Sequence, residues 1–192
     1  MNKLIVAVTP EREVEGESGI IAEMLRAGAD FVHIRHPEAS TAEVKRIIEN
    51  VPHPMRRKLR LHGHFDLVWE FNLGGLHLNG RCPRPPAGYS GSLSLTCHSL
   101  PEVADAAADG RYDYVTLSPI CASVSKPGYG GNAFTSADLD SIEPRHRVVA
   151  LGGITPDLIP GLERYNFVGY ALLGTLWNSR HPADIIRKIR KL

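Results

Sequence analysis

The chain has 192 residues, of which 43% are hydrophobic and 22% are charged, and its formal net charge is +1. This length and composition predict a single globular domain over residues 1–192 rather than a disordered chain. Because the net charge is close to zero, no extended basic field exists to attract a nucleic acid or an anionic membrane, and we expect neither as a partner.

The first residues, MNKLIVAVTP, carry one lysine and a short apolar run, which fits neither a secretion signal nor a membrane-spanning helix. That apolar run is the first of eight short segments, rich in β-branched residues, that we expect to be strands. In chain order they are LIVAVT (4–9), FVHIR (31–35), LRLH (59–62), GLHL (75–78), SLSLTCH (92–98), DYVTLS (113–118), RVVALG (147–152) and FVGYALL (167–173).

Helical patterns lie between most of these strands, and three of them have a recognisable start. The start signals are the S-x-x-E pairs Ser40 with Glu43 and Ser99 with Glu102, and the dipeptide Thr155-Pro156. Residues 79–91 contain too much proline and glycine for a full helix, so the fourth unit is expected to be a loop. The pattern predicts an α/β fold, a compact single-domain (β/α)8 TIM barrel with some shortened helices, with an open doubly wound sheet as the alternative.

Side chains alternate along a barrel strand between the interior and the surrounding helices. We expect the interior and mouth to receive His33, Arg35, His62, His77, Ser94, Thr96, His98, Thr116 and Ser118. The helix-facing set is then Val32, Ile34, Leu61, Leu76, Leu78, Leu93, Leu95, Val115 and Leu117. Polar groups at strand ends indicate an active site at the C-terminal mouth, where this fold places its chemistry.

Glycines follow the last two predicted strands. Gly152 and Gly153 end the seventh strand, and Gly174 ends the eighth. Exposed backbone N–H groups in such turns suit a phosphate oxygen, and the loops after strands seven and eight are the usual phosphate site of this barrel. A tight turn without a ligand is the alternative for each glycine taken alone.

Arg35 and four histidines are the candidate ionisable site residues. Arg35 suits a bidentate contact with a phosphate or pyrophosphate, although a salt-bridged surface arginine fits equally well. His33, His62, His77 and His98 fit ligands, acids, bases or buried core groups. No adjacent carboxylate marks a magnesium site and no short spacing marks a zinc site, so the metal stays unknown and proton transfer is the easier role.

The cysteines Cys82, Cys97 and Cys121 are odd in number and lack C-x-x-C spacing, which indicates neither a disulfide framework nor a zinc ribbon. A reducing cytoplasm is therefore the expected compartment.

The segment YVTLSPICASVSKPGYGG (114–131) begins as a strand and continues as a long irregular run containing Ser123, Ser125 and Lys126. Long irregular segments in compact domains are usually disordered or functional. A flexible surface loop and a lid or binding loop both fit this pattern.

Five ordered blocks resemble the thiamine phosphate synthase and TenI family. FVHIRHPEAS looks like the family's Q-L-R-x-K segment, and FNLGGLHL looks like its G-A-D-G-V-H-L. LTCHS resembles its S-x-H-S, and YVTLSPICASVSK resembles its Y-x-x-x-G-P-I-F-x-T-x-T-K. VVALGGIT resembles its V-A-I-G-G-I. The resemblance implies a (β/α)8 barrel that binds a thiazole phosphate and, in the synthase branch, a hydroxymethylpyrimidine pyrophosphate.

The resemblance also implies roles for individual residues. Ser123 and Ser125 match the threonines that contact the thiazole phosphate, and Lys126 and Arg35 match the pyrophosphate contacts. Thr96 matches a serine near the pyrimidine, and Gly153 matches the phosphate-binding glycine. The resemblance further implies that the irregular segment is a substrate lid, which its glycines Gly128, Gly130 and Gly131 let open and close. The candidate catalytic residues are Arg35, Lys126, His62 and His98. The candidate substrate-binding residues are His33, Thr96, Ser123, Ser125, Gly152, Gly153 and Gly174.

The chain departs from the family at several positions. The strand-two glutamine and lysine become His33 and Pro37, and the N-D pair after strand three becomes His62 and Gly63. The second acidic position falls in residues 79–82, which contain no acid. Both expected magnesium carboxylates are thus missing, which leaves magnesium open.

The resemblance implies a synthase that acts on phosphorylated small molecules and needs no organic cofactor. One alternative is a TenI-like thiazole phosphate tautomerase with His98 or His62 as a proton relay, although Ser118 and Pro119 stand where that branch has its histidine. The other is a non-catalytic regulator that binds thiamine phosphate. The oligomeric state stays open, with a homodimer among the options.

Overall fold

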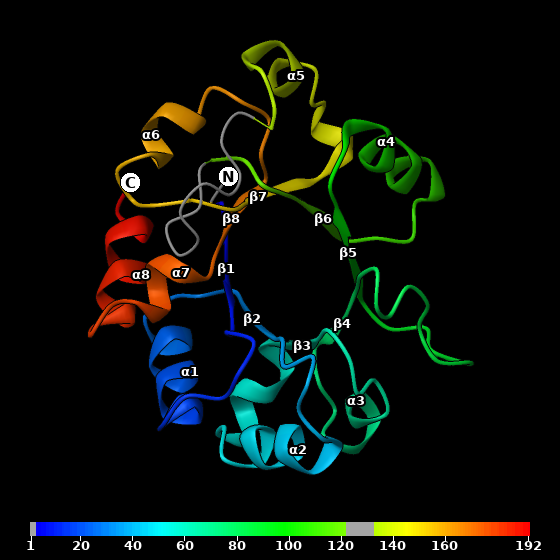
Figure 1. The fold of residues 1–192 in the computed structure, drawn as a ribbon, viewed down its shortest axis with the longest axis vertical. Coiled ribbons are helices and arrows are strands. Elements are labelled where there is room, and N and C mark those ends of the chain that lie inside the picture. Colours follow the sequence, from blue (N-terminus) through cyan, green and yellow to red (C-terminus); the bar gives the residue numbers. More distant parts are fainter. Residues whose placement is uncertain (1–2, 122–132) are drawn as a thin grey trace.

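The computed structural model describes residues 3–121 and 133–192. Eight parallel strands pair in chain order, and β8 pairs with β1 to close a barrel (Figure 1). The strands are β1 Leu4–Val8, β2 Phe31–Ile34, β3 Leu59–Leu61, β4 Gly75–Leu78, β5 Leu93–Cys97, β6 Tyr114–Leu117, β7 Val148–Leu151 and β8 Gly169–Leu172. Each lies within a predicted segment. The (β/α)8 barrel is confirmed, and the open doubly wound sheet is wrong because the sheet has no edge.

Helices surround the barrel and are mostly short (Figure 1). They are α1 Glu17–Arg26, α2 Thr41–Glu49, α3 Leu67–Glu70, α4 Leu100–Asp109, α5 Ser136–Asp140, α6 Ile159–Leu162, α7 Gly174–Trp177 and α8 Pro182–Arg190, with 3-10 helices at His53–Lys58 and Pro144–His146. The chain between β4 and β5 forms a loop, as predicted. Several single-turn helices let the barrel close within 192 residues. None of the helices in the described ranges is long and apolar enough to cross a membrane.

The predicted helix starts are only partly confirmed. Ser40 and Glu43 form a reciprocal capping box at α2. At α4 the Ser99 hydroxyl accepts from the Glu102 N–H, but the Glu102 carboxylate accepts from the His98 N–H at 2.5 Å. The Ser99 cap is therefore present, while the reciprocal half of its box has moved by one residue toward the barrel mouth.

The predicted start at Thr155 is wrong. Helix α6 begins at Ile159, and its N-cap, Leu158, makes no side-chain capping bond. The Leu158 N–H donates to the Thr155 carbonyl at 3.1 Å, closing a turn before the helix. The loop after β7 is consequently longer than the sequence signal indicated.

The strands separate two hydrophobic layers. The outer layer joins strands to helices and contains Val32, Ile34, Leu61, Leu76, Leu78, Leu93, Val115 and Leu117, with Leu95 packed against it. The inner layer contains Val6, Val8, Tyr114, Val149 and Ala171. The predicted outward set is thus confirmed, because strand parity decides which side chains meet the helices. The cysteines Cys82, Cys97 and Cys121 are free thiols.

Candidate active site

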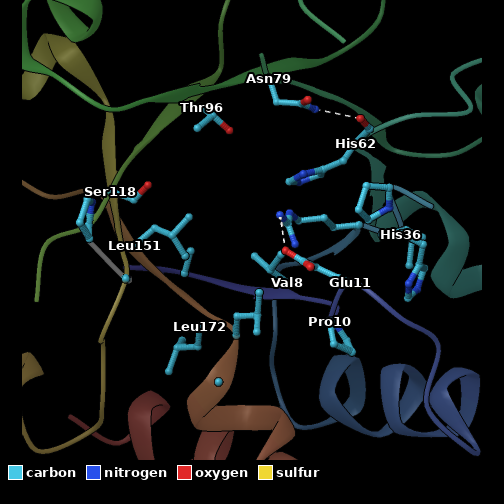
Figure 2. A pocket seen from close by; sticks show the side chains of 18 of the residues that line it. Val8, Pro10, Glu11, His36, His62, Asn79, Thr96, Ser118, Leu151 and Leu172 are labelled. Atoms are coloured by element: carbon cyan, nitrogen blue, oxygen red, sulfur yellow. Dashed lines mark hydrogen bonds and ion pairs between the residues drawn. The ribbon is translucent and has the colours of Figure 1, made fainter. Parts of the chain in front are cut away.

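A cavity of about 890 Å³ opens at the barrel mouth, the end at which the eight strands have their C-termini (Figure 2). Its wall runs from Val8 on β1 to Thr175 after β8. Of the sequence-predicted site residues, the wall includes Arg35, His62, Thr96, His98, Gly152, Gly153 and Gly174. Ser123, Ser125 and Lys126 lie outside the described residues. The structure therefore brings seven of the predicted residues to one cavity.

Arg35 follows β2, and two contacts fix its position. Its backbone N–H donates to the buried Thr9 hydroxyl at 2.8 Å, which ties the end of β2 to the end of β1. Its Nη2 donates to Glu11 Oε1 at 3.1 Å, and both residues line the cavity, where Figure 2 labels Glu11. Arg35 is therefore salt-bridged and lines the cavity, while its contact with a phosphate stays a prediction.

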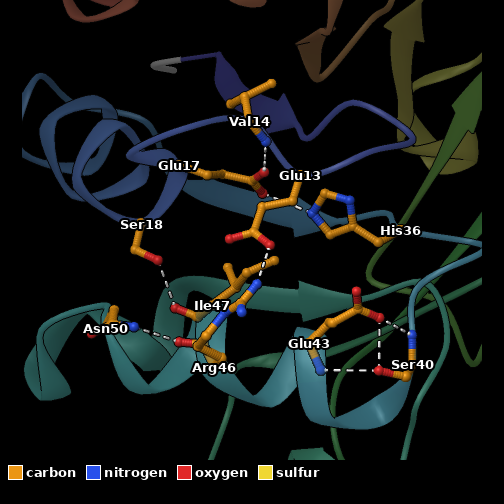
Figure 3. Close-up of polar contacts among 10 residues, drawn as sticks. All are labelled: Glu13, Val14, Glu17, Ser18, His36, Ser40, Glu43, Arg46, Ile47 and Asn50. Atoms are coloured by element: carbon orange, nitrogen blue, oxygen red, sulfur yellow. Dashed lines mark hydrogen bonds and ion pairs between the residues drawn. The ribbon is translucent and has the colours of Figure 1, made fainter.

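The next residue, His36, also lines the cavity, and its side chain pairs with a glutamate of α1. His36 Nε2 lies 2.8 Å from Glu17 Oε1 on α1, and both side chains are buried (Figure 3). Glu17 Oε2 also accepts from the Val14 N–H at 3.1 Å. This pair ties the segment carrying Arg35 to α1. This pair was not among the sequence-based predictions, although strand parity places His36 on the helix side.

The glycine turns after β7 and β8 lie on the cavity wall and contact each other. Gly152 and Gly153 have φ angles of 94° and 67°. A Cβ atom on Gly152 would lie 2.9 Å from Pro119 Cα, so the position excludes a side chain. The Thr175 hydroxyl, one residue after Gly174, donates to the Ile154 carbonyl at 2.6 Å. This hydrogen bond therefore joins the two turns.

Three histidines from adjacent strands meet inside the barrel. The His62 and His77 rings stack with centroids 4.3 Å apart, and the His33 ring lies 5.0 Å and 4.7 Å from them. His33 Nδ1 lies 2.9 Å from His62 Nε2, and His33 Nε2 lies 2.6 Å from the Tyr114 hydroxyl. His62 lines the cavity, whereas His33 is fully buried beneath it. The predicted inward orientation is confirmed, but His33 reaches a ligand in the cavity only through His62.

Hydroxyl groups of β5 hold His77 from both sides. His77 Nδ1 lies 2.8 Å from Ser94 Oγ, and His77 Nε2 lies 2.7 Å from Thr96 Oγ1. Burial is the main cause that lowers the pKa of His77 to about 3. Burial and the neighbouring imidazoles also lower the pKa of His33 and His62 well below the ordinary value. The cluster is therefore neutral at physiological pH.

A buried arginine lies near the cluster. Arg60 pairs with Asp113 at 3.2 Å, and its guanidinium lies 4.5 Å from the Phe31 ring centroid and 5.1 Å from that of Tyr114. Its positive charge contributes to the lowered pKa of His33 and His77. Neither Arg60 nor Tyr114 was a predicted site residue, although Arg60 has the same strand parity as His62.

His98 occupies the mouth after β5. Its ring Nδ1 lies 3.1 Å from the Ser118 carbonyl and 3.4 Å from the Ser118 hydroxyl. The residue is exposed, in contrast to the three histidines of the cluster. His98 is therefore directed at the loop after β6 and is separate from the buried network.

The loop after β4 is held by Asn79. Its amide nitrogen donates to the His62 carbonyl at 2.8 Å, and its amide oxygen accepts from the Arg81 and Cys82 N–H groups at 3.0 Å and 3.2 Å. These bonds engage both ends of the amide. Among the wall residues that the structure describes, Glu11 supplies the sole carboxylate.

Comparison with known proteins gives a consistent result. A family model described as thiamine monophosphate synthase matches residues 5–176. A thiamine-phosphate synthase of Bacteroides fragilis is 26% identical over 179 residues, covering 86% of this chain and 87% of the relative. The crystal structure of a thiamine phosphate pyrophosphorylase from Bacteroides thetaiotaomicron is 33% identical, covers 98% of this chain and 96% of its own, and has a TM-score of 0.85. One from Pyrococcus furiosus, 18% identical with a TM-score of 0.79 and covering 99% and 95%, shares the fold.

Proposed function

Because this chain belongs to the thiamine monophosphate synthase family, we propose that it joins a hydroxymethylpyrimidine pyrophosphate to a thiazole phosphate, forming thiamine phosphate and releasing pyrophosphate. The family match along nearly the whole barrel carries this proposal. The bond between the pyrimidine methylene carbon and the leaving oxygen breaks, and its electron pair departs with pyrophosphate. The lone pair of the thiazole nitrogen then forms the new carbon–nitrogen bond.

The thiazole phosphate is assigned to the surface formed by Gly152, Gly153 and Gly174. Glycine lets an anion approach the backbone closely, and N–H groups in such turns bind phosphate oxygens. The bond from Thr175 to the Ile154 carbonyl, which joins the two turns, supports this assignment. Ser123 and Ser125 keep their predicted contribution from the loop after β6, which the described residues do not include.

The leaving pyrophosphate is assigned to Arg35. Its guanidinium lies on the cavity wall and is positioned by Glu11, so it can stabilise the charge that develops on the leaving oxygens without rearranging. Thr96 remains the candidate contact for the pyrimidine, and His62 lines the same cavity (Figure 2). Lys126 keeps its predicted role at the pyrophosphate, and His98 is placed at the rim.

The family's magnesium does not fit the residues described at this site. Magnesium prefers carboxylate and other oxygen ligands. Glu11 is the sole carboxylate on the described wall and accepts the Arg35 hydrogen bond at 3.1 Å. The Asn79 amide is held within its own loop. We therefore assign no step to magnesium, and the described side chain that offsets the leaving charge is Arg35.

Steady-state turnover of the purified chain tests the proposal. The chain is incubated with both phosphorylated substrates, with and without magnesium, and released pyrophosphate and thiamine phosphate are measured. Equal amounts of both products support the synthase. Isomerisation of the thiazole phosphate alone would identify a tautomerase, and tight binding without either reaction would identify a regulator. Neither alternative is favoured by a described residue, since Ser118 and Pro119 stand at the position of the tautomerase histidine.

A further inference from the structure

The buried histidines offer a chemistry that the proposed reaction does not use. One ring nitrogen from each of His33, His62 and His77 lies within 4.8 Å of the other two. Neutral imidazole is a ligand that zinc and neighbouring first-row metals prefer, whereas magnesium prefers oxygen. We propose that His33, His62 and His77 form a site for one divalent transition-metal ion of the zinc or cobalt class.

The distances set how far the side chains must move. In a tetrahedral site with metal–nitrogen bonds near 2.0–2.1 Å, ligand nitrogens are roughly 3.3 Å apart. The rings must therefore approach one another by on the order of 1 Å. His33 Nδ1 and His62 Nε2 already lie 2.9 Å apart, so the metal replaces the hydrogen bond between them. Each imidazole is neutral before and after binding and keeps one N–H.

The far sides of two rings already have the contacts that metal ligands need. Histidines bound to a metal usually donate their second ring nitrogen to a fixed acceptor, which sets the tautomer and the ring orientation. The Tyr114 hydroxyl lies 2.6 Å from His33 Nε2, and the Ser94 hydroxyl lies 2.8 Å from His77 Nδ1. Either hydroxyl can accept such a proton by rotating its own. The opposite ring nitrogens would bind the metal: His33 Nδ1, which lies 2.9 Å from His62 Nε2, and His77 Nε2, which must give up its contact with the Thr96 hydroxyl at 2.7 Å.

The protonation state also favours a metal, because a protonated imidazole cannot bind one. Burial keeps the pKa of His33 and His62 well below its ordinary value and that of His77 at about 3. A metal therefore does not compete with protons at neutral pH. The positive charge of Arg60 repels a cation at this site, but the carboxylate of Asp113, which pairs with Arg60 at 3.2 Å, reduces this repulsion.

Access to the site comes from one member of the cluster. His62 is on the cavity wall, whereas His33 and His77 are buried. A metal would therefore reach the three rings from the cavity, past His62. The inference goes beyond the proposed synthase reaction, and its test needs no substrate.

Metal binding by the untagged, chelator-treated chain tests the site. Zinc is measured by equilibrium dialysis and cobalt by visible absorption. We expect one ion per chain and no displacement by a large excess of magnesium. His62→Gln and His77→Gln should each weaken binding by more than about a hundredfold, and Tyr114→Phe by about tenfold, as for loss of an outer contact to a ligand. His98→Gln, at the same mouth but outside the cluster, should bind as the wild type does.

Two further measurements separate this site from its competitors. A double variant, Cys82→Ser with Cys121→Ser, should retain binding, because thiols on the cavity wall are the alternative zinc ligands. In NMR spectra of the wild type, zinc should shift the imidazole proton resonances of His33, His62 and His77. The resonances of the exposed His181 should stay unchanged. This reading does not depend on a variant that folds. Absence of saturable binding, binding that survives His62→Gln, or loss of binding in the cysteine variant would each overturn the proposal.

Discussion

His33 Nε2 lies 2.6 Å from the Tyr114 hydroxyl, so side chains from β2 and β6 meet across the barrel interior. His33 continues this contact to His62 at 2.9 Å. A polar chain therefore runs from the buried interior to the cavity wall. Because each of its histidines is kept neutral by burial, the interior should respond to acid in a way that an apolar barrel would not.

The first prediction concerns the pH dependence of stability. Between pH 6.5 and the much lower pKa of the folded cluster, the unfolded chain binds more protons than the folded chain, so the free energy of unfolding falls as pH falls. Each histidine that stays neutral in the folded chain lowers the free energy of unfolding by about 2 kcal/mol between pH 6.5 and pH 5. Urea unfolding with a chelator present should show a loss from pH 7 to pH 5 that is smaller by roughly this amount in His77→Gln. The exposed-histidine variant His181→Gln should keep the wild-type loss, and an unchanged loss in His77→Gln would contradict the prediction.

The second prediction concerns Arg35. Arg35→Ala should lower the kcat/KM for pyrophosphate release at least about tenfold, because a lost charge-assisted contact to a leaving group costs roughly 1.5–3 kcal/mol. Arg46→Ala is the matched control, since Arg46 also pairs with a glutamate, Glu13, but lies on the exposed face of α2. Equal turnover in the two variants would remove Arg35 from the mechanism.

The third prediction concerns the glycine turns and varies the ligand. Gly153→Val is unsuitable because Gly153 has a φ of 67°, which a β-branched residue adopts only under strain. Calorimetric titration should instead show the thiazole phosphate binding at least about tenfold more tightly than its dephosphorylated alcohol, as expected from charge-assisted hydrogen bonds to the phosphate. Equal affinities would mean that the turns after β7 and β8 hold no phosphate.

The fourth prediction compares two glutamates near α1 that each contact a basic side chain (Figure 3). Glu17→Ala leaves the buried His36 without its partner and should reduce the free energy of unfolding by about 3 kcal/mol. Glu13→Ala removes the exposed contact to Arg46 and should change it by less than about 1 kcal/mol. Denaturant unfolding of both variants measures the difference. Similar losses would show that burial does not decide the value of the Glu17 contact.

The sequence determined the barrel because its order of elements is a local property. Eight β-branched segments with helix starts between them specify alternating strands and helices, and the period of two along each strand assigns Leu61 outward and His62 inward without knowledge of the neighbours. The Ser40 cap was predictable for the same reason, since both of its partners lie within one turn. Thr155 misled because the helix start also depends on the turn that closes at Leu158.

Tertiary structure alone decided which of these residues touch. His33, His62 and His77 are separated by 29 and 15 positions in the chain, and no short spacing marks them as a cluster. The strand register places Leu61 opposite Leu76, one residue before His62 and His77, and His33 opposite Arg60, two residues before His62 on the same face. The same holds for Glu17 with His36 and for Tyr114 with His33, which meet through packing of α1 and closure of the barrel. Parity gives the face of a side chain, whereas its neighbours, its burial and hence its pKa follow only from how the strands close around it.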